Sequence, residues 1–220
     1  MNNNVRFELS FKNISQLENK LNFCRFNNIK NINIPCKGLI KKELFNSTIN
    51  YISKNFHEFN VTYHYSLYHQ YSKNKDTSYH DFLNFIKNSH TNRNYEILLV
   101  SGSKKKKNFD SIDVLDYLKK EKNLNVKFGI AYNPYLEKYY NISSERERFE
   151  KKISTGLINS IWFQYGTDIK VLQNEVIYLK KVAKDEKLNL FGSLFIPSKQ
   201  FIARFKFRPW REVHISEKCL

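Results

Sequence analysis

Two hydrophobic patterns alternate along the whole chain, and this alternation limits the folds that are open to it. Short apolar runs with β-branched or aromatic residues predict strands. These runs lie at residues 5–10, 31–35, 60–67, 96–100, 126–132, 160–165, 188–196 and, more weakly, 212–216. Stretches with helical spacing separate them. A strand therefore recurs every ~25 to 35 residues, which is the size of a βα unit.

Apolar stripes and capping residues predict several of the intervening helices. The clearest stripes lie at residues 82–86, 112–118 and 171–182. Asp110 resembles a helix start, and another helix is expected to begin near Ser143 or Ser144. The charges alternate in sign at residues 145–148, which indicates a solvated helix face.

Seven strong strands and one weak strand predict an α/β fold of the TIM type, a (βα)8 barrel. The last strand falls close to residue 220, so the expected barrel is abbreviated and lacks the last helix. An open doubly wound sheet is the alternative, but no G-x-G-x-x-G follows the first strand. Only 4 Pro and 6 Gly occur, and no linker-like stretch divides the chain, so residues 1–220 are expected to form a single domain.

Cysteine usage and hydropathy bear on the compartment. Cys24, Cys36 and Cys219 are widely spaced, and no Cys/His spacing typical of a zinc site occurs, so we expect a reduced compartment and no metal. The sequence begins without the apolar run of a signal peptide, and no later run is as long as a membrane span. These features predict a soluble cytoplasmic protein without a membrane partner. A homo-oligomer remains open.

The chain is strongly basic, with a formal net charge of +16. Such a charge raises the question of a nucleic-acid partner. The excess is spread over both halves of the chain, and its one dense run is Lys104 to Lys107. This run indicates a solvated loop or a local phosphate site rather than a nucleic-acid groove. Nucleic acid is therefore not the expected partner, and an accessory RNA-binding role is a third hypothesis that rests on charge alone.

Polar side chains stand at the ends of several predicted strands. Buried parallel strands are apolar on both faces, and a TIM-type barrel has its site at the carboxyl ends of the strands. The polar residues at these ends are Glu8, His64, Ser66, Ser101, Ser103, Tyr132, Asn133 and Gln164. In a barrel they would converge on one mouth. Arg208-Pro209-Trp210-Arg211 would either bind a ligand phosphate or plug the exposed end of the barrel.

Five short motifs follow one another along nearly the whole chain. They are Phe7-Glu8-Leu9-Ser10, His64-Tyr65-Ser66, Ala131-Tyr132-Asn133-Pro134, Lys152 with Gly156, and Gln164-Tyr165-Gly166-Thr167-Asp168. In this order they resemble the Phe-Glu-Phe-Phe, His-Leu-Thr, Ala-Tyr-Pro, Lys-x-x-x-Gly and Gln-aromatic-Asp motifs of the methylenetetrahydrofolate reductase superfamily. The chain thus resembles a short, divergent member of that superfamily.

The resemblance implies reduction of 5,10-methylenetetrahydrofolate to 5-methyltetrahydrofolate, with hydride passing from NADH or NADPH through FAD. By the same resemblance Glu8 is the general acid that protonates the folate nitrogen. Gln164 and Ser103 are assigned to the folate substrate. The residues assigned to the cofactor are His64, Ser66, Ser101, Tyr132 and Lys152. A carboxyl at the end of a strand, partly desolvated by Phe7, would keep its proton near neutrality.

The fourth strand departs from the family pattern. Where the family has Leu-Arg-Gly-Asp, this chain has Val100-Ser101-Gly102-Ser103. The Arg that meets the cofactor pyrophosphate is missing, and Lys104 to Lys107 would have to replace it. Nothing nearby replaces the Asp carboxylate. The second hypothesis is therefore a non-redox folate-binding or regulatory protein derived from the family.

Overall fold

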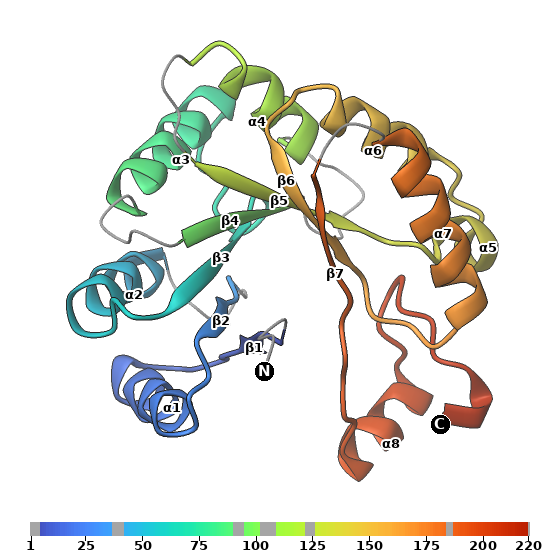
Figure 1. Cartoon of the computed structure of the whole chain (residues 1–220), viewed down its shortest axis with the longest axis horizontal. Helices are drawn as coiled ribbons and strands as arrows, with labels where there is room; N and C mark the ends of the chain where they lie inside the picture. Colours follow the sequence, from blue (N-terminus) through green and yellow to red (C-terminus); the bar gives the residue numbers. More distant parts are fainter. Residues whose placement is uncertain are drawn as a thin grey trace. The chain divides into compact units, whose positions relative to one another are not determined.

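The computed structural model describes residues 5–36, 42–89, 95–101, 109–121, 126–183 and 187–219. It shows an α/β fold in which parallel strands alternate with helices (Figure 1). The strands follow one another in the sheet in chain order, from β1 to β7. In a doubly wound sheet the strand order reverses partway across the sheet, so this sequential order favours the predicted TIM-type fold over the doubly wound alternative. The chain forms two compact units, residues 1–128 and 129–220, and the expectation of a single domain stays a prediction.

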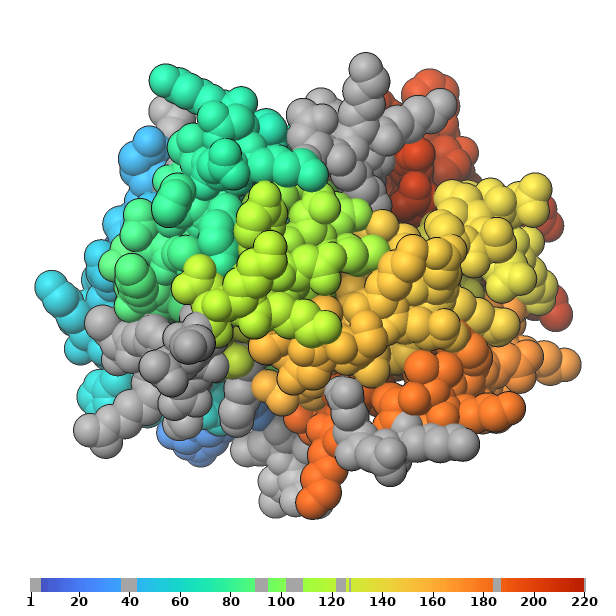
Figure 2. All heavy atoms as spheres, turned by 90° about the horizontal axis from the view of Figure 1, so that it is seen from above, coloured from blue at the N-terminus to red at the C-terminus, as the bar shows by residue number. Residues whose placement is uncertain are grey.

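The first unit contains four strand and helix pairs. Its elements are β1 Phe7–Glu8, α1 Ile14–Phe26, β2 Asn31–Ile34, α2 Lys42–Asn55, β3 Asn60–Ser66, α3 Lys75–Ser89, β4 Tyr95–Val100 and α4 Ser111–Leu118. The four helices lie along one side of their strands (Figure 1). α3 and α4 lie side by side on the surface (Figure 2), where the rings of Tyr79 and Tyr117 are 4.7 Å apart.

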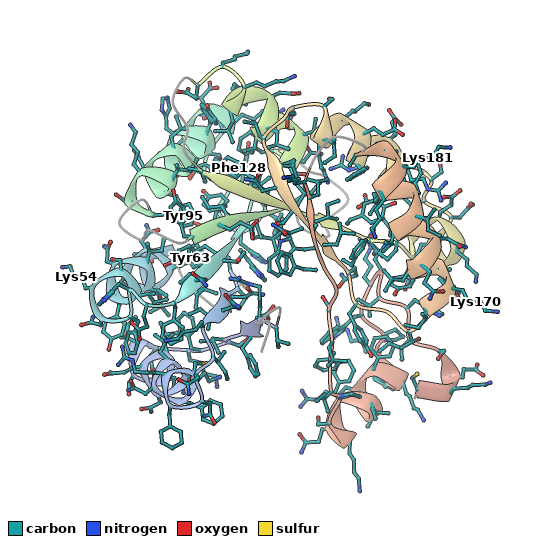
Figure 3. The ribbon with its side chains drawn as sticks, viewed as in Figure 1. Lys54, Tyr63, Tyr95, Phe128, Lys170 and Lys181 are labelled. Carbon is teal, nitrogen blue, oxygen red and sulfur yellow. The ribbon has the colours of Figure 1, made fainter. Side chains whose placement is uncertain are left out.

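Successive side chains of a strand point to opposite faces of its sheet, so the two faces can differ in composition. In the first unit, the face toward the helices is aromatic. Tyr63 (Figure 3) and Tyr65 of β3 are both buried. The Tyr65 ring lies 4.6 Å from the Phe82 ring and 4.7 Å from the Phe85 ring, both on α3. Phe45 of α2 stacks on Phe85 at 5.5 Å. This aromatic layer is the core of the unit.

The other face of the same sheet is polar. Glu8, Asn33, Thr62 and Glu96 occupy matching positions on β1 to β4. The Arg6 guanidinium donates to Asn33 Oδ1 at 2.8 Å and to the carbonyls of Ile32 and Asn60 at 2.9 Å. Thr62 Oγ1 donates to Glu96 Oε2 at 3.3 Å. These hydrogen bonds offset the cost of placing polar groups on a face that is usually apolar.

The second unit begins within β5 Lys127–Tyr132. Its other elements are α5 Leu136–Tyr140, α6 Ser144–Ile153, β6 Ile158–Phe163, α7 Ile169–Val182, β7 Asn189–Phe191, α8 Lys199–Phe207 and a short 3-10 helix, Glu217–Cys219. β6 and β7 pair in parallel. The buried Tyr132 ring contacts the rings of Phe149 from α6 and Phe163 from β6 edge to face.

The predicted strands are largely confirmed, although the strand expected at 5–10 is only Phe7–Glu8. Two further corrections fall near the end of the sequence. The strand expected at 188–196 ends at Phe191, because Gly192 follows and Ser193 Oγ donates to the Phe163 carbonyl at 2.9 Å. The weak strand expected at 212–216 is present only as an isolated parallel bridge between Gly166 and His214. Between them lies α8, which no predicted stripe identified. Its cap is Ser198, whose Oγ accepts from Phe201 N at 3.1 Å.

Among the described residues, no helix is both long enough and apolar enough to serve as a membrane span.

We predict that Arg6→Met lowers the free energy of unfolding by about 2 kcal/mol, because the buried Asn33 amide oxygen and two carbonyls lose a charged donor. Methionine keeps the apolar stem, so the loss reports the hydrogen bonds. Denaturation with urea measures the change. The control is Lys54→Met, which alters an exposed cation on α2 (Figure 3) and should change stability by less than about 0.5 kcal/mol. Equal effects of the two substitutions would contradict a bridging role for Arg6.

Candidate functional site

Glu8 lies at the carboxyl end of β1, as predicted for the general acid. Its side chain is exposed, and Phe7 beside it is 43% exposed. The expectation that Phe7 desolvates the carboxyl is therefore wrong. The reason is the length of β1, which is only two residues and leaves both side chains near the surface.

His64 and Ser66 lie on β3, on the same face as Thr62 because they follow it at two-residue intervals. His64 is half-buried and Ser66 is buried. Ser66 Oγ accepts from His69 N at 3.4 Å. Matching register places Glu8 and Thr62 on this face too. The first unit thus carries the predicted acid and two predicted cofactor residues on one polar face.

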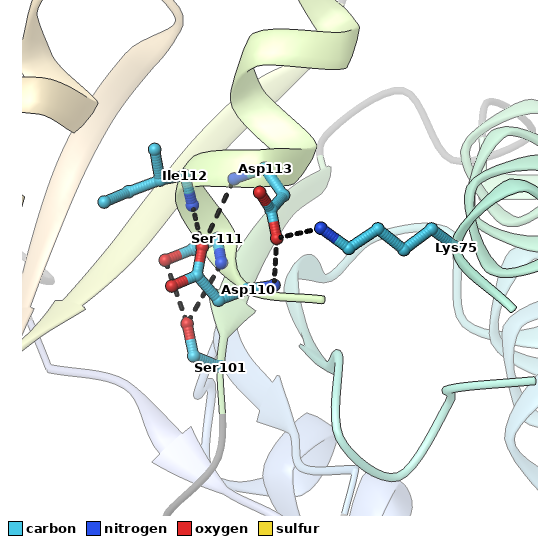
Figure 4. Close-up of polar contacts among 6 residues, drawn as sticks. All are labelled: Lys75, Ser101, Asp110, Ser111, Ile112 and Asp113. Carbon is cyan, nitrogen blue, oxygen red and sulfur yellow. Dashed lines mark hydrogen bonds and ion pairs between the residues drawn. The ribbon is translucent and has the colours of Figure 1, made fainter. Parts of the chain in front are cut away.

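Ser101 follows β4, and its hydroxyl is engaged by the start of α4 (Figure 4). Ser101 Oγ lies 3.0 Å from Ser111 Oγ and accepts from Ser111 N at 3.1 Å. Asp110 caps the same helix by accepting from the N–H groups of Ile112 and Asp113, which confirms the predicted helix start. Ser101 therefore ties the end of β4 to α4. Ser103 and the lysines at 104–107 lie outside the described residues.

In the second unit, the Tyr132 hydroxyl donates to the buried Glu175 carboxylate on α7. Arg146 of α6 donates to both oxygens of that carboxylate, at 2.6 and 3.2 Å. The Arg146 guanidinium also lies over the Tyr178 ring at 4.5 Å. Burial is the main cause that raises the pKa of Tyr132, and the Glu175 carboxylate adds to it, so the phenol stays protonated.

The sequence analysis did not predict this hydrogen-bond network. Arg146 lies in a run whose alternating charges indicate a solvated face, whereas the structure pairs it with a buried acid. The available signal was Glu175, a lone carboxylate within the apolar stripe of α7. The hollow beside the network is lined mainly by polar residues and has a volume of about 10 Å³. That volume corresponds to about one water molecule.

Gln164 directly follows β6, and its side chain is exposed. Its backbone N–H donates to the Tyr132 carbonyl at 2.8 Å. The ends of β5 and β6, where Tyr132 and Gln164 were predicted to lie, are therefore adjacent. Gln164 Oε1 accepts from Tyr165 N at 3.0 Å. Lys152, near the end of α6, is buried. A buried ammonium is far less accessible to a cofactor phosphate than a surface lysine.

Residues 212–216, here called the C-terminal strap, lie against the ends of these strands. Asn133 Nδ2 donates to the Glu212 carbonyl at 2.8 Å, and Thr167 N donates to the His214 carbonyl at 3.1 Å. The His214 ring stacks on Tyr139 with centroids 3.5 Å apart. Gly166, opposite His214, has to be glycine, because a Cβ there would lie 2.2 Å from the Tyr135 ring.

Asp168, the acid of the last motif, caps α7 by accepting from Val171 N at 3.1 Å. Lys138 Nζ donates to it at 2.8 Å and the Tyr139 hydroxyl at 2.5 Å. The hydrogen bond from Lys138 is the main cause that lowers the pKa of Asp168, followed by that from Tyr139. Asp168 is therefore ionised at neutral pH, and it fixes the phenol on which His214 stacks.

Within the described ranges, no three His, Cys, Asp or Glu side chains are grouped so that they could hold a metal ion. A comparison with protein-family models gives no match, and a comparison with curated protein sequences gives no significant match.

We predict that Tyr132→Phe lowers the free energy of unfolding by about 1 to 2 kcal/mol, because the buried Glu175 carboxylate loses a donor. Tyr178→Phe is the matched control. Its hydroxyl donates at 2.6 Å to Glu150, an exposed carboxylate that water can solvate, so we expect a loss of less than about 1 kcal/mol. Chemical denaturation measures both. A larger loss for Tyr178→Phe would refute the importance of the Tyr132 hydrogen bond.

The strap should make stability depend on pH. Partial burial is the main cause that lowers the pKa of His214 from 6.5, and Lys138 lowers it further while Asp168 opposes them. The unfolded chain then binds the proton more tightly, so stability is full above pH 6.5 and falls as the pH drops toward the lowered pKa. We predict that His214→Phe, which keeps a stacking ring, removes this component from denaturation curves recorded across that range. An unchanged pH dependence would show that His214 does not cause it.

Proposed function

We propose that this chain is a folate-linked oxidoreductase of the methylenetetrahydrofolate reductase kind, which reduces 5,10-methylenetetrahydrofolate to 5-methyltetrahydrofolate with NADH or NADPH. The observation that carries the proposal is the polar face of the first unit. Glu8 lies there at a strand end, exposed to an incoming ligand, with His64 and Ser66 on the same face. Parallel α/β folds bind their ligands at the carboxyl ends of strands.

Exposure of Glu8 is compatible with a role as general acid. A pterin ring that covers the carboxyl would take it out of water, and desolvation favours the protonated form of a carboxyl. The proton would then be delivered to the folate nitrogen as the ring opens and an iminium forms for hydride attack. Positioned proton transfer of this kind typically contributes about 10²- to 10⁴-fold to a rate.

The second part of the proposal concerns Tyr132 and Gln164. The main-chain hydrogen bond between them keeps the exposed Gln164 amide at the carboxyl ends of β5 and β6. An amide can both donate to and accept from a pterin edge. The Tyr132 hydroxyl serves the Glu175 network and its ring is buried between Phe149 and Phe163, so in this proposal Tyr132 meets no ligand and only positions Gln164 through its carbonyl.

The described residues fit FAD poorly. In the position of the family's Arg stands Ser101, whose hydroxyl is bonded to Ser111 and cannot replace a guanidinium at a pyrophosphate. We therefore derive no step through flavin, and the proposed hydride donor is the reduced nicotinamide. The same observation favours a second candidate function, a non-redox folate-binding or regulatory protein.

The proposal also includes a finer fold than the strand order alone. We propose that the strands close into an abbreviated TIM-type (βα)8 barrel, as the sequential strand order from β1 to β7 would allow. The bridge between Gly166 and His214 places the C-terminal strap beyond the end of β6 rather than beside β7, so the strap is not the eighth strand in this proposal.

The first experiment combines absorption spectroscopy with a turnover assay on the full chain. The protein is purified, supplied with FAD and dialysed, and then mixed with methylenetetrahydrofolate and NADH or NADPH. Oxidation of the nicotinamide with formation of methyltetrahydrofolate supports the reductase, and a retained flavin spectrum would overturn the flavin-independent route. Binding of folate without turnover supports the non-redox alternative, and absence of binding refutes both.

We predict that Glu8→Gln lowers kcat by at least about 100-fold, because glutamine cannot donate the proton. The affinity for folate should change less than about threefold, since the amide keeps the shape and hydrogen-bonding capacity of the side chain. Glu43→Gln, which changes an exposed acid on α2, is the matched control and should leave kcat unaltered. Unchanged turnover in Glu8→Gln would remove Glu8 from the mechanism.

A further inference from the structure

The segment from residue 194 to residue 211, which includes α8, exposes large apolar side chains. Phe207 is 92% exposed, Leu194 90%, Ile196 85% and Trp210 53%. We call it the 194–211 surface. Isolated apolar residues at a surface are common, whereas several within one short segment mark an interaction site.

The 194–211 surface is built on a packed scaffold. Phe201 of α8 lies 4.6 Å from the Phe195 ring and 4.8 Å from the Trp210 ring. Phe205 is buried on the inner face of α8. Phe207 lies two residues further on, about 200° around the helix, and therefore faces outward. The exposed Trp210 is thus held in place by the rings of Phe195, Phe201 and Phe205.

The same surface is cationic. Its basic residues are Lys199, Arg204, Lys206, Arg208 and Arg211, all of them exposed. No Asp or Glu occurs between residues 187 and 211. Arg204 and Lys206 lie about 100° to either side of Phe205, so cations flank the outward face on both sides. Arg211 contacts the Glu212 carboxylate at 3.2 Å.

We propose that the 194–211 surface binds the surface of an anionic lipid membrane. Phe207 at the end of α8 and Leu194, Ile196 and Trp210 on the segments that flank it are the side chains proposed to insert below the headgroups. Lys and Arg beside exposed aromatic and aliphatic residues are typical of peripheral binding to an anionic membrane interface. The binding is peripheral, which differs from the spanning helix that the described residues lack. It revises the expectation that the protein has no membrane partner.

The charge and the aliphatic residues of the 194–211 surface argue against two other partners, a second copy of this chain and a single-stranded nucleic acid. A second copy of this chain would bring two strongly cationic surfaces together, which is unfavourable. A single-stranded nucleic acid would use the cations and the aromatic rings, but Leu194 and Ile196 offer it no stacking platform. Lipid headgroups and acyl chains satisfy both kinds of residue at once.

The test uses the full chain and sedimentation with two kinds of vesicle, phosphatidylcholine alone and phosphatidylcholine with phosphatidylserine. We expect the protein to bind the phosphatidylserine vesicles at least about tenfold more tightly, and added salt should weaken that binding because it screens the attraction. Equal binding to both vesicles, or binding to neither, would overturn the proposal.

Variants separate apolar insertion from general electrostatic attraction. Leu194→Ser with Phe207→Ser should weaken binding to phosphatidylserine vesicles by about tenfold or more. The matched apolar control is Phe26→Ser, which changes a side chain on α1 that is 87% exposed and should leave binding unaltered. Circular dichroism checks that each variant folds. An equal loss in the control would show that the 194–211 surface is not the site.

A second pair of variants tests the charges. Arg204→Gln with Lys206→Gln should weaken binding more than Lys170→Gln with Lys181→Gln, two exposed lysines of α7 (Figure 3). Equal effects would mean that only the net charge of the chain matters. Competition with RNA and with polyglutamate completes the experiment. Displacement from the vesicles by either polymer, without dependence on Leu194 and Phe207, would assign the surface to that polymer class instead.

Discussion

The hydrogen bonds of Arg6 hold together the polar face on which the proposed site depends. β1 contributes only two residues to the sheet, too few to fix a strand by its own ladder. The guanidinium just before it reaches across β2 to the Asn60 carbonyl at the start of β3, and it bonds the buried Asn33 amide on the way. Burial lowers the pKa of Arg6 while the Glu96 carboxylate opposes that, yet a guanidinium remains charged in either case. Together with the main-chain hydrogen bond from Leu9 N to the Asn33 carbonyl at 2.9 Å, this side chain fixes the position of Glu8, two residues later.

Much of the fold could be predicted because it depends on local patterns. The seven strands and the cap at Asp110 follow from apolar runs and from side-chain chemistry within a few residues. The end of β7 could not be predicted in this way. An apolar run continues to Ile196, but the Ser193 hydroxyl takes the Phe163 carbonyl and the chain turns into α8. That competition is between segments 30 residues apart, and hydrophobic periodicity carries no information about it.

In the candidate site, too, features set by local patterns could be predicted, whereas features set by distant contacts could not. Tyr132 and Gln164 lie at adjacent strand ends because strand pairing alone decides that position. The hydrogen-bond acceptor of the Tyr132 hydroxyl could not be predicted from the sequence, because it lies 43 residues away on α7. Arg146 looked like a surface residue for a similar reason, because its partner Glu175 is separated from it by 29 residues. For Glu8 the type of residue and its place at a strand end were predictable, whereas its exposure depended on how short β1 is.

The C-terminal strap has a consequence for the order in which the second unit can be completed. The Asn133 side chain is bonded to a carbonyl 79 residues later in the chain, so this contact closes a long loop. Contacts of such large sequence separation form late, after local helices and neighbouring strands. On the ribosome, the ends of β5 and β6 would be synthesised well before residues 212–216, and their polar groups would meanwhile be solvated by water. The strap is therefore the last piece of this unit to be put in place, and until it docks, Tyr139 and Gly166 face solvent instead of His214.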